Sequence, residues 1–127
     1  GVMYLEKNMD FLVGVDLQDS FVLGWHYNDQ AFEIELEFSI WPESKYYEAP
    51  KIGEHTCYRL GSLLFEGVLS INGLLNQNDM QPTIDLDGSK DYGNIDYFEK
   101  NQSYFKVVGG FGSIEFESSG VHFKLRT

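Results

Sequence analysis

The sequence predicts an antiparallel all-β fold, either a sandwich or a strongly curved sheet of about eight strands with little helix. Residues 31–41 carry the clearest signal, because apolar and polar side chains alternate along AFEIELEFSIW, as they do on a strand with one buried face. The aromatic fraction of 16% suits strands and sandwich cores. No stretch combines a helical period with helix caps. We expect one all-β domain over residues 1–127 and leave open whether Gly1 is native or a cloning remnant.

The first elements are expected to form a β-hairpin. An apolar run at 11–17 comes first, and Asp19–Ser20 indicate a turn. A strand over 20–27 then passes through the polar tip 28–30 into a strand over 31–40. Two such strands around a short tip with Asn and Asp are typical of a hairpin.

A long loop and two strands are predicted next. Pro42 ends the preceding strand, because proline cannot donate to a β-ladder. Residues 42–54 hold two prolines, a glycine and mixed charge, and such a loop is longer than most connections. Residues 55–60 and 62–73 predict strands, and Gly67 indicates a bulge or a close backbone approach.

The second half of the chain begins with loops and ends with strands. Residues 76–82 predict a loop, 83–88 a short strand with a turn, and 94–101 either one helical turn or a strand. Three strands joined by tight, glycine-containing links then predict an antiparallel meander: 103–109, 112–117 and 121–126.

The charge restricts the classes of partner. Twenty acidic and nine basic residues give a net charge of −11. Nucleic acid and anionic membrane surfaces are therefore not expected as partners, because both require a basic surface. No apolar run approaches the roughly 20 residues that cross a bilayer. Cys57 is the single cysteine, which excludes an intramolecular disulfide and fits the cytoplasmic location that we expect.

Three carboxylates share one face of the predicted strand 31–40: Glu33, Glu35 and Glu37. Neighbours on that face lie roughly 6.5–7 Å apart, where two like charges in water repel by about 0.6 kcal/mol. Two interpretations stay open. In the first, the stripe is solvated or paired across strands with the basic stripe His122, Lys124 and Arg126. In the second, it is a landing surface for a basic protein.

Aromatic residues flank the long loop. Tyrosine and tryptophan rings offer a large contact area at low entropic cost, so they favour interfaces, although they also complete sandwich cores. Together with the acidic stripe they give the candidate partner-binding residues: Glu33, Glu35, Glu37, Trp41, Tyr46 and Tyr47.

Metal-binding and catalytic patterns are weak. His55 and Cys57 would share a strand face, yet no second ligand pair accompanies them. Residues 85–91 alternate oxygen ligands and include a glycine, but the calcium-loop spacing and the closing glutamate are missing. We predict no cofactor and no catalytic residue, and leave open whether either segment binds a metal.

One segment carries a family resemblance. Residues 59–75 read RLGSLLFEGVLSINGLL, with Phe65-Glu66-Gly67-Val68 as the most distinctive part, after the strands LGWHY and FEIELEF and before FKVV and IEFE. This order resembles small acidic β-rich bacterial proteins grouped with the immunity proteins of polymorphic toxin systems. The resemblance implies a non-enzymatic domain that binds and neutralises a toxin, here expected to be basic.

Two other functions stay open. The first is a small-ligand-binding or hydrolytic β-barrel whose pocket is lined by Trp25, Tyr27, Tyr58 and a carboxylate, and a deep pocket with converging polar groups would favour it. The second is a homo-oligomeric structural subunit in which an edge strand pairs with its copy.

Overall fold

The computed structural model of the chain describes residues 2–6 and 9–126, with side chains from residue 9 onward. The all-β prediction is confirmed, because 56% of the residues lie in strands and 6% in helical segments. These segments are two short 3-10 turns, η1 (Met9–Leu12) and η2 (Gln77–Asp79). No described helical segment is long and apolar enough to span a membrane.

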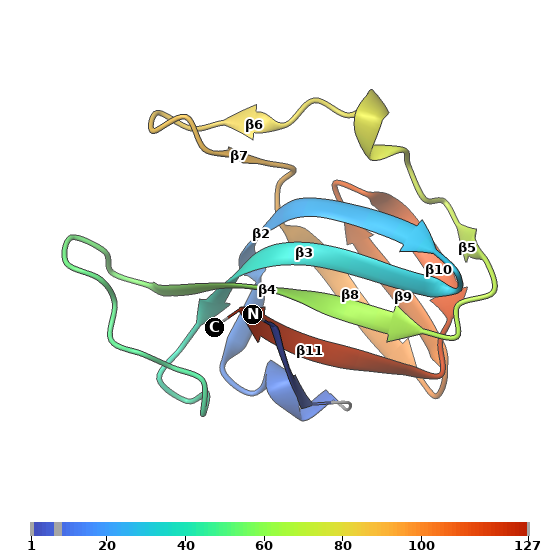
Figure 1. Cartoon of the computed structure of the whole chain (residues 1–127), viewed down its shortest axis with the longest axis horizontal. Coiled ribbons are helices and arrows are strands. Elements are labelled where there is room, and N and C mark those ends of the chain that lie inside the picture. Colours follow the sequence, from blue (N-terminus) through green and yellow to red (C-terminus); the bar gives the residue numbers. More distant parts are fainter. Residues whose placement is uncertain (1, 7–8, 127) are drawn as a thin grey trace.

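The strands form two antiparallel sheets that pack face to face (Figure 1). Sheet A has the order β1 (Val2–Glu6), β11 (Gly120–Arg126), β4 (Cys57–Glu66), β3 (Ala31–Ile40) and β2 (Val15–Asn28). Sheet B has the order β5 (Ile71–Asn72), β10 (Gly112–Glu117), β9 (Tyr104–Gly109) and β8 (Ile95–Asn101). A separate ribbon pairs β6 (Thr83–Ile84) with β7 (Lys90–Asp91).

One hydrophobic core fills the space between the sheets. The even-numbered residues of β3, from Phe32 to Phe38, are completely buried, as their alternation predicted. Phe65 of sheet A contacts two rings of sheet B edge to face, with centroids 5.1 Å from Phe105 and 4.9 Å from Phe116. These contacts join the two sheets, since aromatic pairs in this geometry add to the free energy of burial.

The predicted hairpin is confirmed as β2 and β3, whose turn uses Asp29 and Gln30 in the left-handed region. The turn predicted at Asp19–Ser20 is wrong, because β2 continues through it as one strand. The Ser20 hydroxyl donates to the Asp16 carbonyl at 2.6 Å and accepts from the Ser39 amide at 3.0 Å. The serine therefore satisfies a bulge inside the strand instead of a turn between strands.

The two strands predicted over 55–73 are one strand, β4, which ends before Gly67 and leaves only β5 as a two-residue strand further on. Gly67 has a φ of 64°, and a Cβ there would lie 2.8 Å from the Ser119 hydroxyl oxygen. The nearest backbone atom, Ser119 N, would lie at an ordinary 3.6 Å, so the positive φ and the Ser119 side chain favour glycine here, and the predicted close backbone approach is not found.

The end of the chain is not a simple meander. The β9–β10 hairpin is confirmed and the segment 94–101 is the strand β8, but β10 and β11 lie in different sheets. The link crosses between the sheets, with the Ser118 amide donating to Ser103 and the Ser119 amide donating to Glu66. The tight link at Gly109–Gly110 joins the two strands of a hairpin, as predicted. The hairpin predicted at the link 118–120 is wrong.

Candidate functional site

The three glutamates of the acidic stripe lie on the outer face of sheet A, since the alternate residues of β3 are buried in the core. The strand between them and β11 is β4, which pairs with both. Direct pairing of β3 with the basic stripe His122, Lys124 and Arg126 is therefore wrong. His122 instead lies 2.9 Å from Glu66, and Arg126 lines a small hollow together with Glu35.

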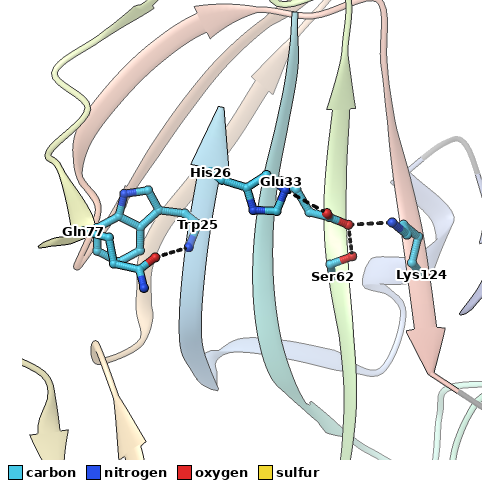
Figure 2. A network of polar contacts seen from close by, with 6 residues as sticks. All are labelled: Trp25, His26, Glu33, Ser62, Gln77 and Lys124. Carbon is cyan, nitrogen blue, oxygen red and sulfur yellow. Dashed lines mark hydrogen bonds and ion pairs between the residues drawn. The ribbon is translucent and has the colours of Figure 1, made fainter. Parts of the chain in front are cut away.

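Glu33 is nevertheless neutralised from within the sheet (Figure 2). It accepts hydrogen bonds from the Ser62 hydroxyl at 2.6 Å and from the Lys124 ammonium group at 2.5 Å, and His26 Nε2 lies 3.3 Å away. Lys124 can reach Glu33 diagonally across β4 because its own cross-strand partner there, Ser62, is small. Burial alone would raise the pKa of Glu33, but the hydrogen bonds from Lys124 and Ser62 outweigh it and lower that pKa. Glu33 therefore has a structural role.

The serine of this network is not placed as a nucleophile. Ser62 is only 5% exposed, and its hydroxyl donates to the Glu33 carboxylate instead of to a histidine. An activated serine would donate to a general base that is itself oriented by a third group. The geometry fits a sheet-stabilising contact.

Glu37, at the other end of the stripe, lies in a different environment. It lines a groove of about 420 Å³ between the β6–β7 ribbon and the end of the long loop, two segments that project from the same end of the sandwich (Figure 1). We call this hollow the acidic groove. Sheet A forms its floor with Phe21, Leu23, Glu37 and Tyr58, and the segments that project from the sheet add Glu54, Asp85, Asp87 and Asp91 as its walls.

The floor of the acidic groove is aromatic and fixed in place. The rings of Phe21 and Tyr58 lie 5.6 Å apart at 48°. The Tyr58 hydroxyl donates to Asp19 at 3.2 Å, and the same carboxylate oxygen accepts from the Ser39 hydroxyl at 3.0 Å. Burial and the neighbouring Asp19 charge raise the pKa of Tyr58. The ring orientation is thus set before any partner arrives.

The lining of the acidic groove carries an excess of negative charge. Among the described residues that line it are five carboxylates and one lysine, Lys90. In the described part of the chain, Glu37 makes no ion pair. Burial raises the pKa of Glu37, the charge of Glu54 raises it further, and Lys51 offsets this only in part. Glu37 is therefore held in an unfavourable environment, unlike Glu33.

Hydrogen bonds within the turn between β6 and β7 hold the ribbon in its shape. The Asp85 amide donates to Ser89 O, and Ser89 donates to the Asp87 carboxylate through both its amide and its hydroxyl. The adjoining Tyr92 amide donates to Val22 of β2 at 2.8 Å, which ties the ribbon to the edge of sheet A. Within the described ranges, no group of three His, Cys, Asp or Glu side chains is close enough to hold a metal ion.

The other candidate residues do not join the stripe. Tyr46 packs against Phe123 at 5.3 Å and Tyr47 also packs against the core, so both lie away from the outer face of sheet A. Trp41 is 50% exposed and lines a shallow hollow with Val13, which is 64% exposed. Of the six predicted contact residues, Glu35, Glu37 and Trp41 are the ones that a partner could reach with little rearrangement.

The alternative ligand pocket does not form from the residues predicted for it. Trp25 is 6% exposed, and its indole donates to Leu75 O at 2.9 Å while Gln77 accepts from its amide (Figure 2). Tyr27 donates to the Val68 carbonyl. Tyr58 lies on the outer face of sheet A, so the three rings do not converge.

His55 and Cys57 lie in different environments. His55 is exposed and lines the acidic groove, whereas Cys57 is buried in the core. The shared strand face predicted for them is wrong, because the strand begins only at Cys57. The oligomeric alternative stays a prediction: β8 is an edge strand of sheet B, but it carries charged residues that oppose pairing with a copy.

No family model, curated protein or solved structure matches this chain. The acidic groove was missed from the sequence because its residues come from separate segments: Phe21, Glu37, Glu54, Tyr58 and 85–91. The acidic turn 85–91 was noticeable as a pattern, but its position opposite Glu37 depends on the fold.

Proposed function

We propose that this chain is a non-enzymatic protein-binding domain whose partner is a basic protein, and that the acidic groove is the centre of the contact surface. The observation that supports it is the gathering of carboxylates from three separate segments around a fixed aromatic floor. Like charges at short range disfavour the free protein, and a cationic partner would relieve that repulsion.

The comparison of Glu33 with Glu37 supports a binding role for one end of the stripe. Both belong to the same face of β3. Glu33 is surrounded by donors, whereas burial and neighbouring negative charges raise the pKa of Glu37. Local conflicts of this kind, where the fold does not satisfy a residue, are concentrated at functional sites.

The chemistry of the rim favours a protein over a small cation. Leu60, opposite Glu37 on β4, is 41% exposed, and Leu86 at the tip of the ribbon is fully exposed. Protein interfaces combine an apolar or aromatic centre with a polar rim. Complementary charge would accelerate the encounter with a basic partner, and the aromatic floor would slow its dissociation.

The finer proposal is that the chain is an immunity-type inhibitor that covers a basic toxin. It rests on the resemblance carried by residues 59–75 and on the net charge of −11. Acidic inhibitors of basic toxins bind by covering a surface, which requires no catalytic group.

Affinity capture with matched charge variants tests the proposal. The chain is immobilised, host extract is applied at about 50 mM salt, and bound proteins are eluted by a gradient to about 500 mM, because screening weakens such contacts. The groove variant carries Glu37→Gln, Glu54→Gln and Asp87→Asn. The control variant removes the same number of charges from exposed sites on sheet B, with Asp96→Asn, Glu99→Gln and Glu117→Gln.

We expect the wild type and the control variant to retain the same basic protein and the groove variant to lose it. Equal retention by the groove variant would rule out the acidic groove as the contact surface. If no basic protein is retained by the wild type at low salt, the partner class itself is wrong.

A further inference from the structure

We infer that the acidic groove receives an arginine side chain of the partner, with the guanidinium group lying against the rings of Phe21 and Tyr58 and its N–H groups donating to the wall carboxylates. This inference rests on the proposed function and adds the recognised group. It is carried by three observations: the paired rings of the floor, the carboxylates from three separate segments that line the same hollow, and the volume of that hollow.

The floor suits a flat cation. Phe21 of β2 and Tyr58 of β4 are both half-buried, and their rings lie 5.6 Å apart across the intervening strand β3 on the outer face of sheet A. A guanidinium group stacks on aromatic faces and is more weakly hydrated than an ammonium group, so it loses less on leaving water. The Tyr58 hydroxyl already donates to Asp19, so this tyrosine would act through its ring.

The walls suit a forked donor. Glu37 lies on β3 beside its cross-strand partner Phe21. Glu54 comes from the long loop, and Asp87 and Asp91 come from the ribbon. A guanidinium group presents five N–H donors in a plane and can serve carboxylates in more than one direction, whereas an ammonium group acts as a point charge. The carboxylate of Glu37, whose pKa is raised, would gain most from such a donor.

The size of the hollow fits a side chain with part of its backbone. A volume of about 420 Å³ lies within the range of ligand sites in proteins. The exposed Leu60 and Leu86 are placed to contact residues that flank the arginine. The partner is therefore expected to present an arginine on a protruding, apolar-flanked segment.

The test uses three capped peptides, Gly-Leu-Arg-Leu-Gly and its lysine and citrulline counterparts, titrated into the ¹⁵N-labelled chain at low salt. Backbone amide shifts report which surface is contacted. We expect the arginine peptide to shift the amides around Phe21, Glu37 and Tyr58. Its affinity should exceed that of the lysine peptide by roughly threefold or more. The citrulline peptide, which keeps the shape without the charge, should bind more weakly than both.

Ring variants complete the test. Tyr58→Leu and, separately, Phe21→Leu should weaken the arginine peptide by roughly threefold or more, whereas Tyr58→Phe, which keeps the ring, should change it less than about twofold. Amide spectra of each variant confirm that it is folded, and the peptide series on the wild type stands without any variant.

The outcomes separate the inference from the proposed function. Equal binding of the arginine and lysine peptides at the groove, unaffected by either leucine variant, overturns the arginine inference and leaves a basic partner. Shifts confined to other surfaces, or no shifts with any peptide, also overturn it, while retention of a basic protein in the capture experiment still decides the proposed function independently.

Discussion

Removal of the Lys124 ammonium group by Lys124→Met should destabilise the protein by about 2 kcal/mol at neutral pH. The side chains of Glu33 and Lys124 are 17% and 12% exposed. Their pair therefore lies between a surface ion pair, worth about 0–1 kcal/mol, and a fully buried one, whose disruption costs about 3–5 kcal/mol. Ser62 and His26 remain beside Glu33 in the variant, which keeps the loss near the middle of that range.

The stabilising contribution of Glu33 should depend on pH. The pKa of Glu33 is lowered in the folded protein, so its contribution is present above the unfolded-state pKa of about 4.3. It is lost as the pH falls through the lower, folded-state pKa. The difference in stability between wild type and variant should therefore shrink when urea unfolding is measured at about pH 3 instead of about pH 7.

Lys100→Met, at an exposed lysine of β8, is the matched control and should change the free energy of unfolding by less than about 0.5 kcal/mol. A loss below about 0.5 kcal/mol for Lys124→Met, or a loss of equal size at both pH values, would refute the role given to this pair.

Three further substitutions test other parts of the structure by urea unfolding. Glu37→Gln should raise the stability at pH 7 by up to about 0.5 kcal/mol, because the pKa of Glu37 is raised in the folded protein and its charge therefore opposes folding above that pKa. The gain should vanish at low pH, and a destabilised variant would contradict this explanation. Ser20→Ala should cost about 1–3 kcal/mol, since it leaves the buried Ser39 amide without its acceptor; a neutral effect would mean that the bulge does not depend on the serine. Gly61→Ala should cost about 1–3 kcal/mol or more, because its Cβ would lie 2.0 Å from the Lys124 carbonyl oxygen and force β4 and β11 apart; unchanged stability would show that the two strands tolerate the separation.

The parts of the fold that follow from local patterns could be predicted from the sequence. Alternation predicted which apolar residues of 31–40 are buried, although Ser39 of the polar face is buried as well, and the polar tip 28–30 marked the hairpin. Asp19–Ser20 misled because serine and aspartate satisfy backbone groups equally well in a turn and in a bulge. The sheet change at 118–119 could not be predicted, since a tight link does not say to which sheet the next strand belongs.

The candidate site was predictable only in part. The acidic stripe on β3 was visible from its spacing, but not the difference between Glu33 and Glu37. That difference depends on which charged side chains lie nearby, Lys124 of β11 in one case and Glu54 of the long loop in the other. Both are distant in sequence from β3, so no local pattern contains them.

The position of β11 has a consequence for synthesis of the chain. Among the described strands it is made last, yet it lies inside sheet A between β4 and β1. While the ribosome is still adding residues 120–126, β4 has an open edge along Leu63 and Phe65, and the first strand has no neighbour. Sheet A can therefore close only after translation of this segment, and the nascent protein must be protected from aggregation until then.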